Sequence, residues 1–261
     1  MIDLKGKTVL ITGGSRGIGK ACVKYFFKAN ANVLFTYGTN VKAANSVIAN
    51  LKKTNTSDST LMGIRVIAGY KMDLGNEGEI VEVIKDMIRK YKKIDILVNN
   101  AGIWKYGEAD RMTSENWEET IRINLTGTFL VTREVSKEMK KHRFGRIINI
   151  TSTAGQRGEA FHSHYAASKG GVISYTKSLA SELAEFNITT NSVAPGWVDT
   201  EMCDEVFADK KYKESVRKGI PVGRIATAED IAGPVLFLAS DLARHINGEI
   251  INVNGGSVLC G

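Results

Sequence analysis

Short apolar runs alternate with longer segments of helical periodicity along almost the whole chain. The apolar runs predict strands at residues 8–12, 32–37, 65–72, 94–99, 146–151, 188–193 and 249–253. The segments between them predict helices at residues 17–29, 41–53, 77–91, 114–141, 164–186 and 228–240, with one long helix or two in the fourth. Buried strands that alternate with helices are typical of a parallel sheet. We therefore predict an α/β fold, a doubly wound parallel sheet of the Rossmann type with helices on both faces.

No composition shift divides the chain of 261 residues. It holds three prolines, no internal repeat and no Pro/Gly-rich linker, so we predict a single domain over residues 1–261. The polar stretch at residues 200–218 is predicted to leave this domain and flank the substrate, and residues 55–59 are predicted to form a loop. Ligands of open α/β sheets bind beyond the carboxyl ends of the strands. We therefore expect the functional side chains at those ends.

A glycine-rich turn, Thr12-Gly-Gly-Ser-Arg-Gly-Ile-Gly19, joins the first predicted strand to the first predicted helix. Glycines let the backbone approach a pyrophosphate closely, and a helix N-terminus offers free N–H groups and a partial positive charge. The turn therefore predicts a dinucleotide site. Its candidate contacts are Gly13, Ser15, Arg16, Gly17, Ile18 and Gly19.

The end of the second predicted strand distinguishes the two nicotinamide dinucleotides. An NAD site usually places Asp or Glu there, to bind a ribose hydroxyl. The chain has no carboxylate between Asp3 and Asp58, and Tyr37-Gly-Thr-Asn40 is neutral. Arg16 could instead bind a 2′-phosphate. These features favour NADP(H) over NAD(H), with Tyr37, Gly38 and Thr39 as candidate contacts.

The next two strand ends supply further candidate contacts. Asp73, with Leu74 beside it, could accept a hydrogen bond from the adenine amino group or could simply cap a turn. Small residues after the fourth strand could let the dinucleotide lie flat against the sheet, while the Asn side chains there could tie strand ends together. The candidates in this segment, which begins at Asn99, are Asn100, Ala101 and Gly102.

Tyr165 and Lys169 are four residues apart in a predicted helix, so their side chains share one face of it. A free phenol has a pKa of ~10 and is a poor base at neutral pH. A nearby ammonium, together with a nicotinamide cation in the oxidising direction, would stabilise the phenolate. Tyr165 is therefore the candidate proton donor to a carbonyl oxygen. Ser152, thirteen residues upstream, is the candidate hydrogen-bond donor to the same oxygen.

The chain resembles the short-chain dehydrogenase/reductase family over nearly its whole length. The resemblance rests on the glycine turn, Asn99-Asn-Ala-Gly102, Asn124, Ser152, Tyr165, Lys169 and Pro195-Gly196. It implies hydride transfer to or from a nicotinamide, and a homotetramer. It also implies that Asn124 supports a bound water that links Lys169 to solvent. The nicotinamide contacts that it implies are Tyr165, Lys169, Pro195, Gly196, Val198 and Thr200.

Several substrate classes remain open. Within the family the chain looks most like 3-oxoacyl-carrier-protein reductases, which implies an NADPH-dependent reductase of 3-oxoacyl thioesters linked to a carrier protein or to CoA. The basic run at residues 137–146 could dock an acidic carrier or could be a solvated helix end, and Phe186 stands where that group often carries a second docking Arg. A dehydrogenase of sugars, polyols or steroids is the second hypothesis. A non-catalytic dinucleotide sensor is the third.

Composition argues against a membrane protein, a disulfide-rich protein, a metalloenzyme and a nucleic-acid-binding protein. No window approaches the ~18 apolar residues of a membrane span, and the N-terminus lacks a secretory apolar segment, so we expect a cytoplasmic protein without a membrane partner. Cys22, Cys203 and Cys260 are scattered, and no His/Asp/Glu cluster has metal-ligand spacing, so neither a disulfide framework nor a catalytic metal is expected. The net charge of +7 is spread along the chain without a recognisable nucleic-acid-binding motif, so no nucleic-acid partner is expected.

Overall fold

The computed structural model describes residues 2–55 and 65–260, so most of the predicted loop at residues 55–59 lies outside the described residues. One parallel sheet of seven strands runs through the described part, in the order β3-β2-β1-β4-β5-β6-β7. The strands are β1 (Thr8–Ile11), β2 (Asn32–Tyr37), β3 (Ile67–Lys71), β4 (Ile96–Asn99), β5 (Gly145–Ile150), β6 (Ile188–Pro195) and β7 (Ile250–Val253). The predicted fold class, a doubly wound parallel sheet, is confirmed.

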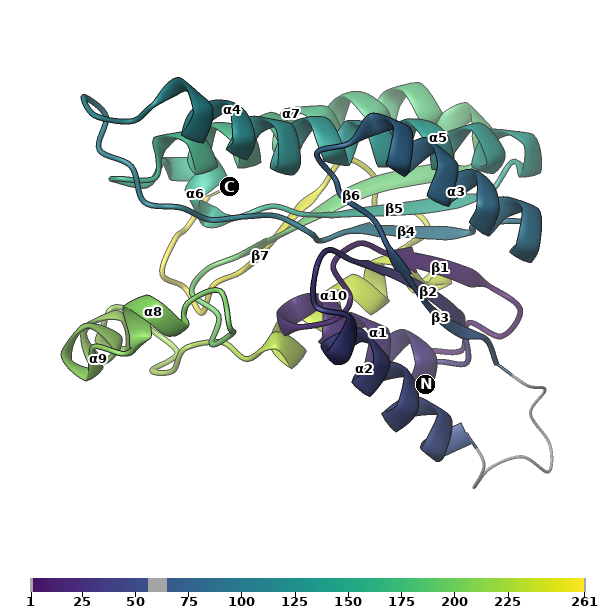
Figure 1. Cartoon of the computed structure of the whole chain (residues 1–261), viewed down its shortest axis with the longest axis horizontal. Coiled ribbons are helices and arrows are strands. Elements are labelled where there is room, and N and C mark those ends of the chain that lie inside the picture. The colour runs from purple at the N-terminus through teal and green to yellow at the C-terminus, as the bar shows by residue number, and fades with distance from the viewer. Residues whose placement is uncertain (1, 56–64, 261) are drawn as a thin grey trace.

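Helices cover both faces of the sheet (Figure 1). One layer holds α1 (Gly17–Lys28), α2 (Val41–Asn55) and α10 (Ala228–Leu238). The opposite layer holds α3 (Glu77–Tyr91), α4 (Ser114–Ile121), α5 (Gly127–His142) and α7 (Ser163–Leu183). Two short helices, α8 (Asp204–Phe207) and α9 (Lys210–Lys218), project away from the sheet. None of the helices in the described part of the chain is long and apolar enough to cross a membrane.

Alternate side chains of each strand enter the two layers, because successive residues of a strand point to opposite faces. Val9 and Val33 pack into the core under α1, α2 and α10, whereas Leu10, Leu34 and Leu97 pack into the core under α3, α5 and α7. Both faces of the sheet are therefore dry, which explains why the strands have no polar alternation in the sequence.

The strand order reverses between β1 and β4. From β1 the chain continues to β2 and β3 on one side, and it then returns to β4 on the other side. The connections at this switch point diverge, so a crevice opens beyond the carboxyl ends of β1 and β4. The sequence predictions placed the site residues along this edge.

Several segments contain helical structure that the sequence did not predict in detail. The predicted helix at residues 114–141 divides into α4 and α5, joined by a single π-helical turn, η1 (Arg122–Thr126). The polar stretch at residues 200–218 forms α8 and α9, and a short helix, α6 (Thr153–Arg157), directly follows β5. A 3-10 turn, η2 (Ala184–Phe186), ends the predicted helix at residues 164–186, and another, η3 (Asp241–Ala243), precedes β7.

Candidate active site

A cavity of about 690 Å³ lies at the carboxyl edge of the sheet, within the size range of small-molecule and cofactor sites. It brings together nearly all of the residues that the sequence singled out. Those that line it are Gly13, Ser15, Arg16, Gly17, Ile18, Tyr37, Gly38, Thr39, Asp73, Leu74, Asn100, Ala101, Gly102, Ser152, Tyr165, Lys169, Pro195, Gly196, Val198 and Thr200. Gly19 and Asn124 do not line the cavity and lie behind its wall.

The glycine turn fits a dinucleotide because side chains are excluded from it. Gly13 has φ +69°, a conformation that favours glycine, and a Cβ there would lie 3.0 Å from the Ala101 Cβ. A Cβ on Gly19 would lie 2.2 Å from the Gly13 carbonyl oxygen. Gly19 therefore lets α1 approach the turn closely, and Gly13 keeps the cavity wall at backbone level.

Arg16 has the position expected of a 2′-phosphate contact. It immediately precedes α1, is exposed, and lines the cavity together with the neutral segment Tyr37, Gly38 and Thr39. Its guanidinium makes no ion pair with any residue in the described part of the chain. A free cation beside a neutral strand end suits a phosphate better than a ribose hydroxyl.

A carboxylate already occupies the start of α1. The Gly17 N–H donates to Glu201 Oε2 at 3.1 Å, so Glu201 accepts a hydrogen bond where the helix N-terminus would otherwise face an anion. Glu201 was not among the residues predicted from the sequence, although it follows the predicted contact Thr200. A pyrophosphate at this helix end would have to displace the Glu201 carboxylate.

The Asn side chains after β4 tie neighbouring strand ends together. Asn99 Nδ2 donates to Asn149 Oδ1 at 2.9 Å, and Asn100 Nδ2 donates to the Thr12 carbonyl at 2.9 Å. Thr12 Oγ1 accepts from the N–H groups of Asn100 and Ala101 at 2.9 and 3.0 Å. Asn99 is therefore a scaffold residue, whereas Asn100 is held in place and also lines the cavity.

Asp73 caps a turn, as one of the two interpretations of the sequence predicted. Its Oδ1 accepts from the Gly75 N–H at 2.8 Å, so the carboxylate caps the turn that follows β3. The residue also lines the cavity, and a contact with an adenine amino group remains a prediction.

Ser152 and Tyr165 lie near each other at the starts of two consecutive helices, α6 and α7. Ser152 directly precedes α6, and its Oγ accepts from the Ala154 N–H at 3.1 Å. The Ser152 side chain also lies close enough to the Tyr165 side chain, in the first turn of α7, to lower the pKa of its phenol. Both hydroxyls line the cavity, so they can approach one substrate oxygen together.

Lys169 lies one turn further along α7 and is buried. Its Nζ donates to the Ile150 carbonyl at 2.8 Å and lies 5.8 Å from the centroid of the Tyr165 ring. The ammonium is therefore fixed beneath the phenol ring by the last residue of β5.

Asn124 lies in the π-helical turn between α4 and α5 and is fully buried. Its Oδ1 accepts from the Ile103 N–H at 2.8 Å, and its Nδ2 donates to the Ile103 carbonyl at 2.9 Å and to Ser168 Oγ at 3.1 Å. These bonds clamp the segment after β4 to α7. A Cβ on Gly102 would lie 3.0 Å from Asn124 Oδ1 and 3.6 Å from Lys169 Nζ, so the three residues adjoin one another.

Burial has the largest effect on the pKa values of Tyr165 and Lys169. Burial raises the pKa of Tyr165 and outweighs the effect of the Ser152 side chain, which lowers it. Burial also lowers the pKa of Lys169 to about 8. The sequence predicted that the neighbouring ammonium would lower the tyrosine pKa. For the chain by itself this prediction is wrong, because the cost of a buried phenolate is larger.

The sequence did not predict the tryptophan side chains in the wall of the cavity beyond Ser152. Trp104 follows the segment after β4, Trp197 follows β6, and their rings lie 5.9 Å apart in an edge-to-face arrangement. Glu159, Met202 and Cys203 line the same region. Two of the three tryptophans therefore lie just after strand ends, a signal that the sequence offered. No group of three or more His, Cys, Asp or Glu side chains suited to a metal ion occurs within residues 2–55 and 65–260.

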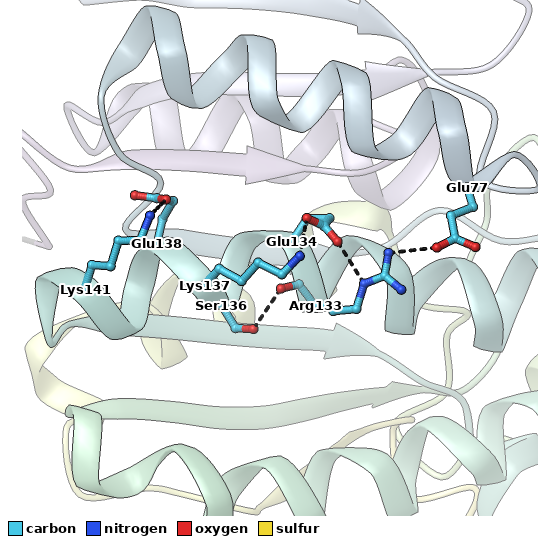
Figure 2. Close-up of polar contacts among 7 residues, drawn as sticks. All are labelled: Glu77, Arg133, Glu134, Ser136, Lys137, Glu138 and Lys141. Carbon is cyan, nitrogen blue, oxygen red and sulfur yellow. Dashed lines mark hydrogen bonds and ion pairs between the residues drawn. The ribbon is translucent and has the colours of Figure 1, made fainter.

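The basic run at residues 137–146 is largely paired with neighbouring acids. Lys137 Nζ contacts Glu134 Oε2 at 2.7 Å, and Lys141 pairs with Glu138 one turn earlier (Figure 2). Lys140 lies 3.8 Å from a Glu182 oxygen. In the same network Arg133 links Glu134 to Glu77 across α3 and α5 (Figure 2). This pattern favours the interpretation as a solvated helix end.

Known proteins resemble the chain in sequence and in structure. The family model described as enoyl-(acyl carrier protein) reductase matches residues 13–257. A 3-oxoacyl-[acyl-carrier-protein] reductase of Aquifex aeolicus is 40% identical over 255 residues, which are 98% of each chain. The nodulation protein G of a Rhizobium species is 38% identical over 256 residues, also 98% of each chain.

A solved structure shows that the fold is also similar to that of a known dehydrogenase. A candidate NAD(P)-dependent gluconate 5-dehydrogenase of Beutenbergia cavernae, crystallised with bound NADP, is 32% identical, covers 98% of each chain and superposes with a TM-score of 0.90. The chain belongs to the short-chain dehydrogenase/reductase family. The family resemblance predicted from the sequence is thus confirmed, and the chain is an oxidoreductase of this family.

Proposed function

We propose that the protein is an NADPH-dependent reductase that acts on the 3-oxo group of acyl thioesters. The observation that carries this proposal is the pair of hydroxyls, Ser152 and Tyr165, which both line the cavity and lie close enough for Ser152 to lower the pKa of Tyr165, with Lys169 buried beside the phenol ring. Relatives of about the same length that are named 3-oxoacyl-[acyl-carrier-protein] reductases support this substrate class.

The side chains divide the work of carbonyl reduction. When bound, NADPH supplies the hydride that reduces the carbonyl carbon. Ser152 orients the carbonyl by donating a hydrogen bond to its oxygen, and Tyr165 gives its proton to that oxygen. The raised pKa of Tyr165 keeps the phenol protonated at neutral pH, which suits a proton donor. Asn124 and Ser168 hold the wall behind Lys169 in place.

Arg16 and the neutral end of β2 support NADPH as the preferred dinucleotide. The guanidinium can contact a 2′-phosphate, and no carboxylate at Tyr37, Gly38 or Thr39 would repel that phosphate. The NADP bound in the similar Beutenbergia structure supports the same choice.

A carrier-protein-linked substrate is the finer part of the proposal. The relatives named after the acyl-carrier protein support it, but the basic run does not add to that support. Arg143 is separated from Ser152 by the six residues of β5, which span ~20 Å. Lys137, Lys140 and Lys141 are paired with carboxylates. We therefore propose that CoA-linked and carrier-linked thioesters are both accepted.

Steady-state NADPH consumption tests the proposal directly. Acetoacetyl-CoA offers a 3-oxo group, and crotonyl-CoA offers only the double bond that the description of the matching family model would suggest. We expect turnover of acetoacetyl-CoA with NADPH and none of crotonyl-CoA. Turnover of crotonyl-CoA alone would refute carbonyl reduction. Tight NADPH binding without turnover of either compound or of simple ketones would favour a sensor.

We also propose a homotetramer, as the family resemblance implies. The exposed aromatic side chains Trp117 on α4 and Phe129 on α5 support a protein contact on this helical layer, because large exposed apolar groups on adjacent elements are typical of interfaces. Light scattering would measure the mass, and a value of one 28.5 kDa chain would refute the assembly.

A further inference from the structure

Glu159 is a carboxylate that lines the same cavity as Tyr165. It belongs to the loop between α6 and α7, and Trp104 and Trp197 line the cavity near it. Its charge influences the pKa of Tyr165, of Cys203 and of Tyr212, so it is close to the reacting end of the cavity and to the substrate-flanking helices. The proposed reduction gives this residue no role.

Aromatic neighbours fix the position of Glu159. The Trp104 side chain lies close enough to the Glu159 carboxylate to lower its pKa. The Trp104 ring stacks on His162 with centroids 4.3 Å apart. His162 Nδ1 donates to the Ala160 carbonyl at 3.0 Å and lies 3.9 Å from Glu159 Oε1. The His162 N–H also donates to the Glu159 carbonyl at 3.2 Å. The carboxylate is thus part of a prearranged wall.

The loop that carries Glu159 has an unfavourable backbone conformation. Phe161 has φ +63°, in the left-handed region that bulky residues rarely adopt. The Gly107 N–H donates to the Phe161 carbonyl at 2.7 Å, and the Phe161 ring stacks on Tyr106 with centroids 5.5 Å apart. Such conformations persist where the surroundings impose them, and they concentrate at binding sites. The loop therefore holds Glu159 in place at a cost to the backbone.

The neighbours of Glu159 leave acceptor capacity on a carboxylate that lines the cavity. A carboxylate has about four acceptor positions, so the neighbouring Trp104 and His162 leave most of them open. Burial raises the pKa of Glu159, because water cannot fully solvate the charge. An alkyl chain placed against this group would remove more water and return no hydrogen bond, whereas a hydroxyl would supply a donor.

We propose that Glu159 is a substrate-specificity residue, and that it selects carbonyl substrates whose carbon skeleton carries a hydroxyl group. The indoles of Trp104 and Trp197 would cover the adjoining C–H face of such a substrate. The inference rests on the proposed carbonyl reduction and concerns the part of the substrate beside the reacting carbonyl, so it applies to acyl thioesters and to free ketones alike.

Cyclohexanone and its 2-, 3- and 4-hydroxy derivatives test the proposal, because they present the same carbonyl and move one hydroxyl through graded positions. The measured quantity is kcat/KM with NADPH. We expect at least one hydroxylated ketone to exceed cyclohexanone by about tenfold or more, since a site built to accept a hydroxyl hydrogen bond rejects the analogue that lacks it. Equal values for all four ketones would overturn the proposal.

Three variants assign the preference to the carboxylate. Glu159→Gln keeps an acceptor oxygen and should retain most of the preference, whereas Glu159→Leu should bring the ratio between hydroxylated and parent ketone to about one. Glu205→Leu, which removes an exposed carboxylate of α8 that does not line the cavity, should leave the ratio unchanged. A preference that survives in Glu159→Leu would contradict the role. A larger gain from 4-aminocyclohexanone than from any hydroxyl would identify a cation site instead.

Binding without turnover separates this inference from the proposed function. Trp104 and Trp197 report on the cavity through their fluorescence, and Trp117→Phe removes the exposed tryptophan outside it. Cyclohexane-1,4-diol should bind about tenfold more tightly than cyclohexanol, and Glu159→Leu should remove the difference. If no ketone or thioester is reduced but this difference holds, the proposed carbonyl reduction is refuted and the recognition of a hydroxyl by Glu159 is supported. If turnover occurs and no hydroxylated compound is favoured in either assay, only the recognition of a hydroxyl by Glu159 is refuted.

Discussion

Tyr165 and Lys169 illustrate how burial and catalysis compete at single side chains. The cavity wall raises the pKa of the phenol and lowers that of the ammonium to about 8. Each change favours the neutral form of its own residue. At neutral pH the phenol therefore keeps the proton that carbonyl reduction requires, and Lys169 remains mostly charged.

Replacing Tyr165 by Phe removes the proton donor and leaves the ring in place. We expect kcat for acetoacetyl-CoA to fall by at least about a hundredfold, the lower end of general-acid contributions. NADPH binding, measured by the fluorescence of the bound dinucleotide, should change little. Substantial residual turnover in Tyr165→Phe would contradict proton transfer from the phenol.

The lowered pKa of Lys169 predicts how the rate depends on pH. In the direction of reduction, kcat/KM should be constant below about pH 8 and fall as the pH rises through the lysine pKa. Because arginine stays protonated, Lys169→Arg should keep less activity but lose this break. A rate that increases through pH 8 would refute the role of the charged lysine.

Protein stability should change in the opposite direction over the same range. The folded-state pKa of Lys169, about 8, lies below its ordinary value of 10.5, so the unfolded chain binds more protons between these values. The contribution of this residue to folding therefore becomes more favourable as the pH rises from about 8 to 10. A fall in the rate over that range, without a fall in the Tm, would exclude unfolding as its cause.

At the scale of elements, the close packing of α1 against the glycine turn predicts a strong effect of one methyl group. Gly19→Ala would place a Cβ 2.2 Å from the Gly13 carbonyl oxygen, so the helix must shift. We expect a loss of about 1–3 kcal/mol in the free energy of unfolding, as for other overpacked cores, and weaker NADPH binding. Urea denaturation and fluorescence titration would measure the two effects.

Gly78→Ala is the matched control for that change. Gly78 is exposed in the first turn of α3, and a Cβ there would meet only Asn76 Oδ1 at 3.4 Å, an ordinary contact. Since alanine has the higher helix propensity, this variant should be neutral or more stable by up to ~1 kcal/mol. If Gly19→Ala and Gly78→Ala change the free energy of unfolding and NADPH binding to the same extent, the close approach at Gly19 does not contribute to either.

The sequence predicted elements well where one periodicity dominated a segment. Strands β1, β2 and β5 are mostly buried and each contains a run of apolar residues, so no helical periodicity competed with the prediction. The break between α4 and α5 was harder to foresee, because Asn124 gains its buried partners Ile103 and Ser168 only in the folded chain. Glu159 and Trp104 were missed for the same reason, since their contacts join loops that are about fifty residues apart.

For the whole molecule, ligand binding should appear as a gain in thermal stability. A ligand at a hundredfold its Kd stabilises the folded state by about 2.7 kcal/mol, which raises the Tm of a chain of this size by about 5–10 °C. We expect this shift with NADPH and a much smaller one with NADH at the same concentration. In Arg16→Ala the two dinucleotides should give similar shifts, because the phosphate contact is lost. Equal shifts for the unchanged protein would refute the contact.

The substrate wall and the dinucleotide turn come from different loops of one rigid sheet, joined at its carboxyl edge. Trp197 and the projecting helices α8 and α9 belong to a single connection between β6 and α10. An engineer could therefore transplant the part of that connection after Glu201 from a homologue, which would retarget the catalyst and leave Gly196, Val198 and Thr200 beside the predicted dinucleotide site. Divergence by natural selection could follow the same route, changing what is reduced without rebuilding the redox machinery.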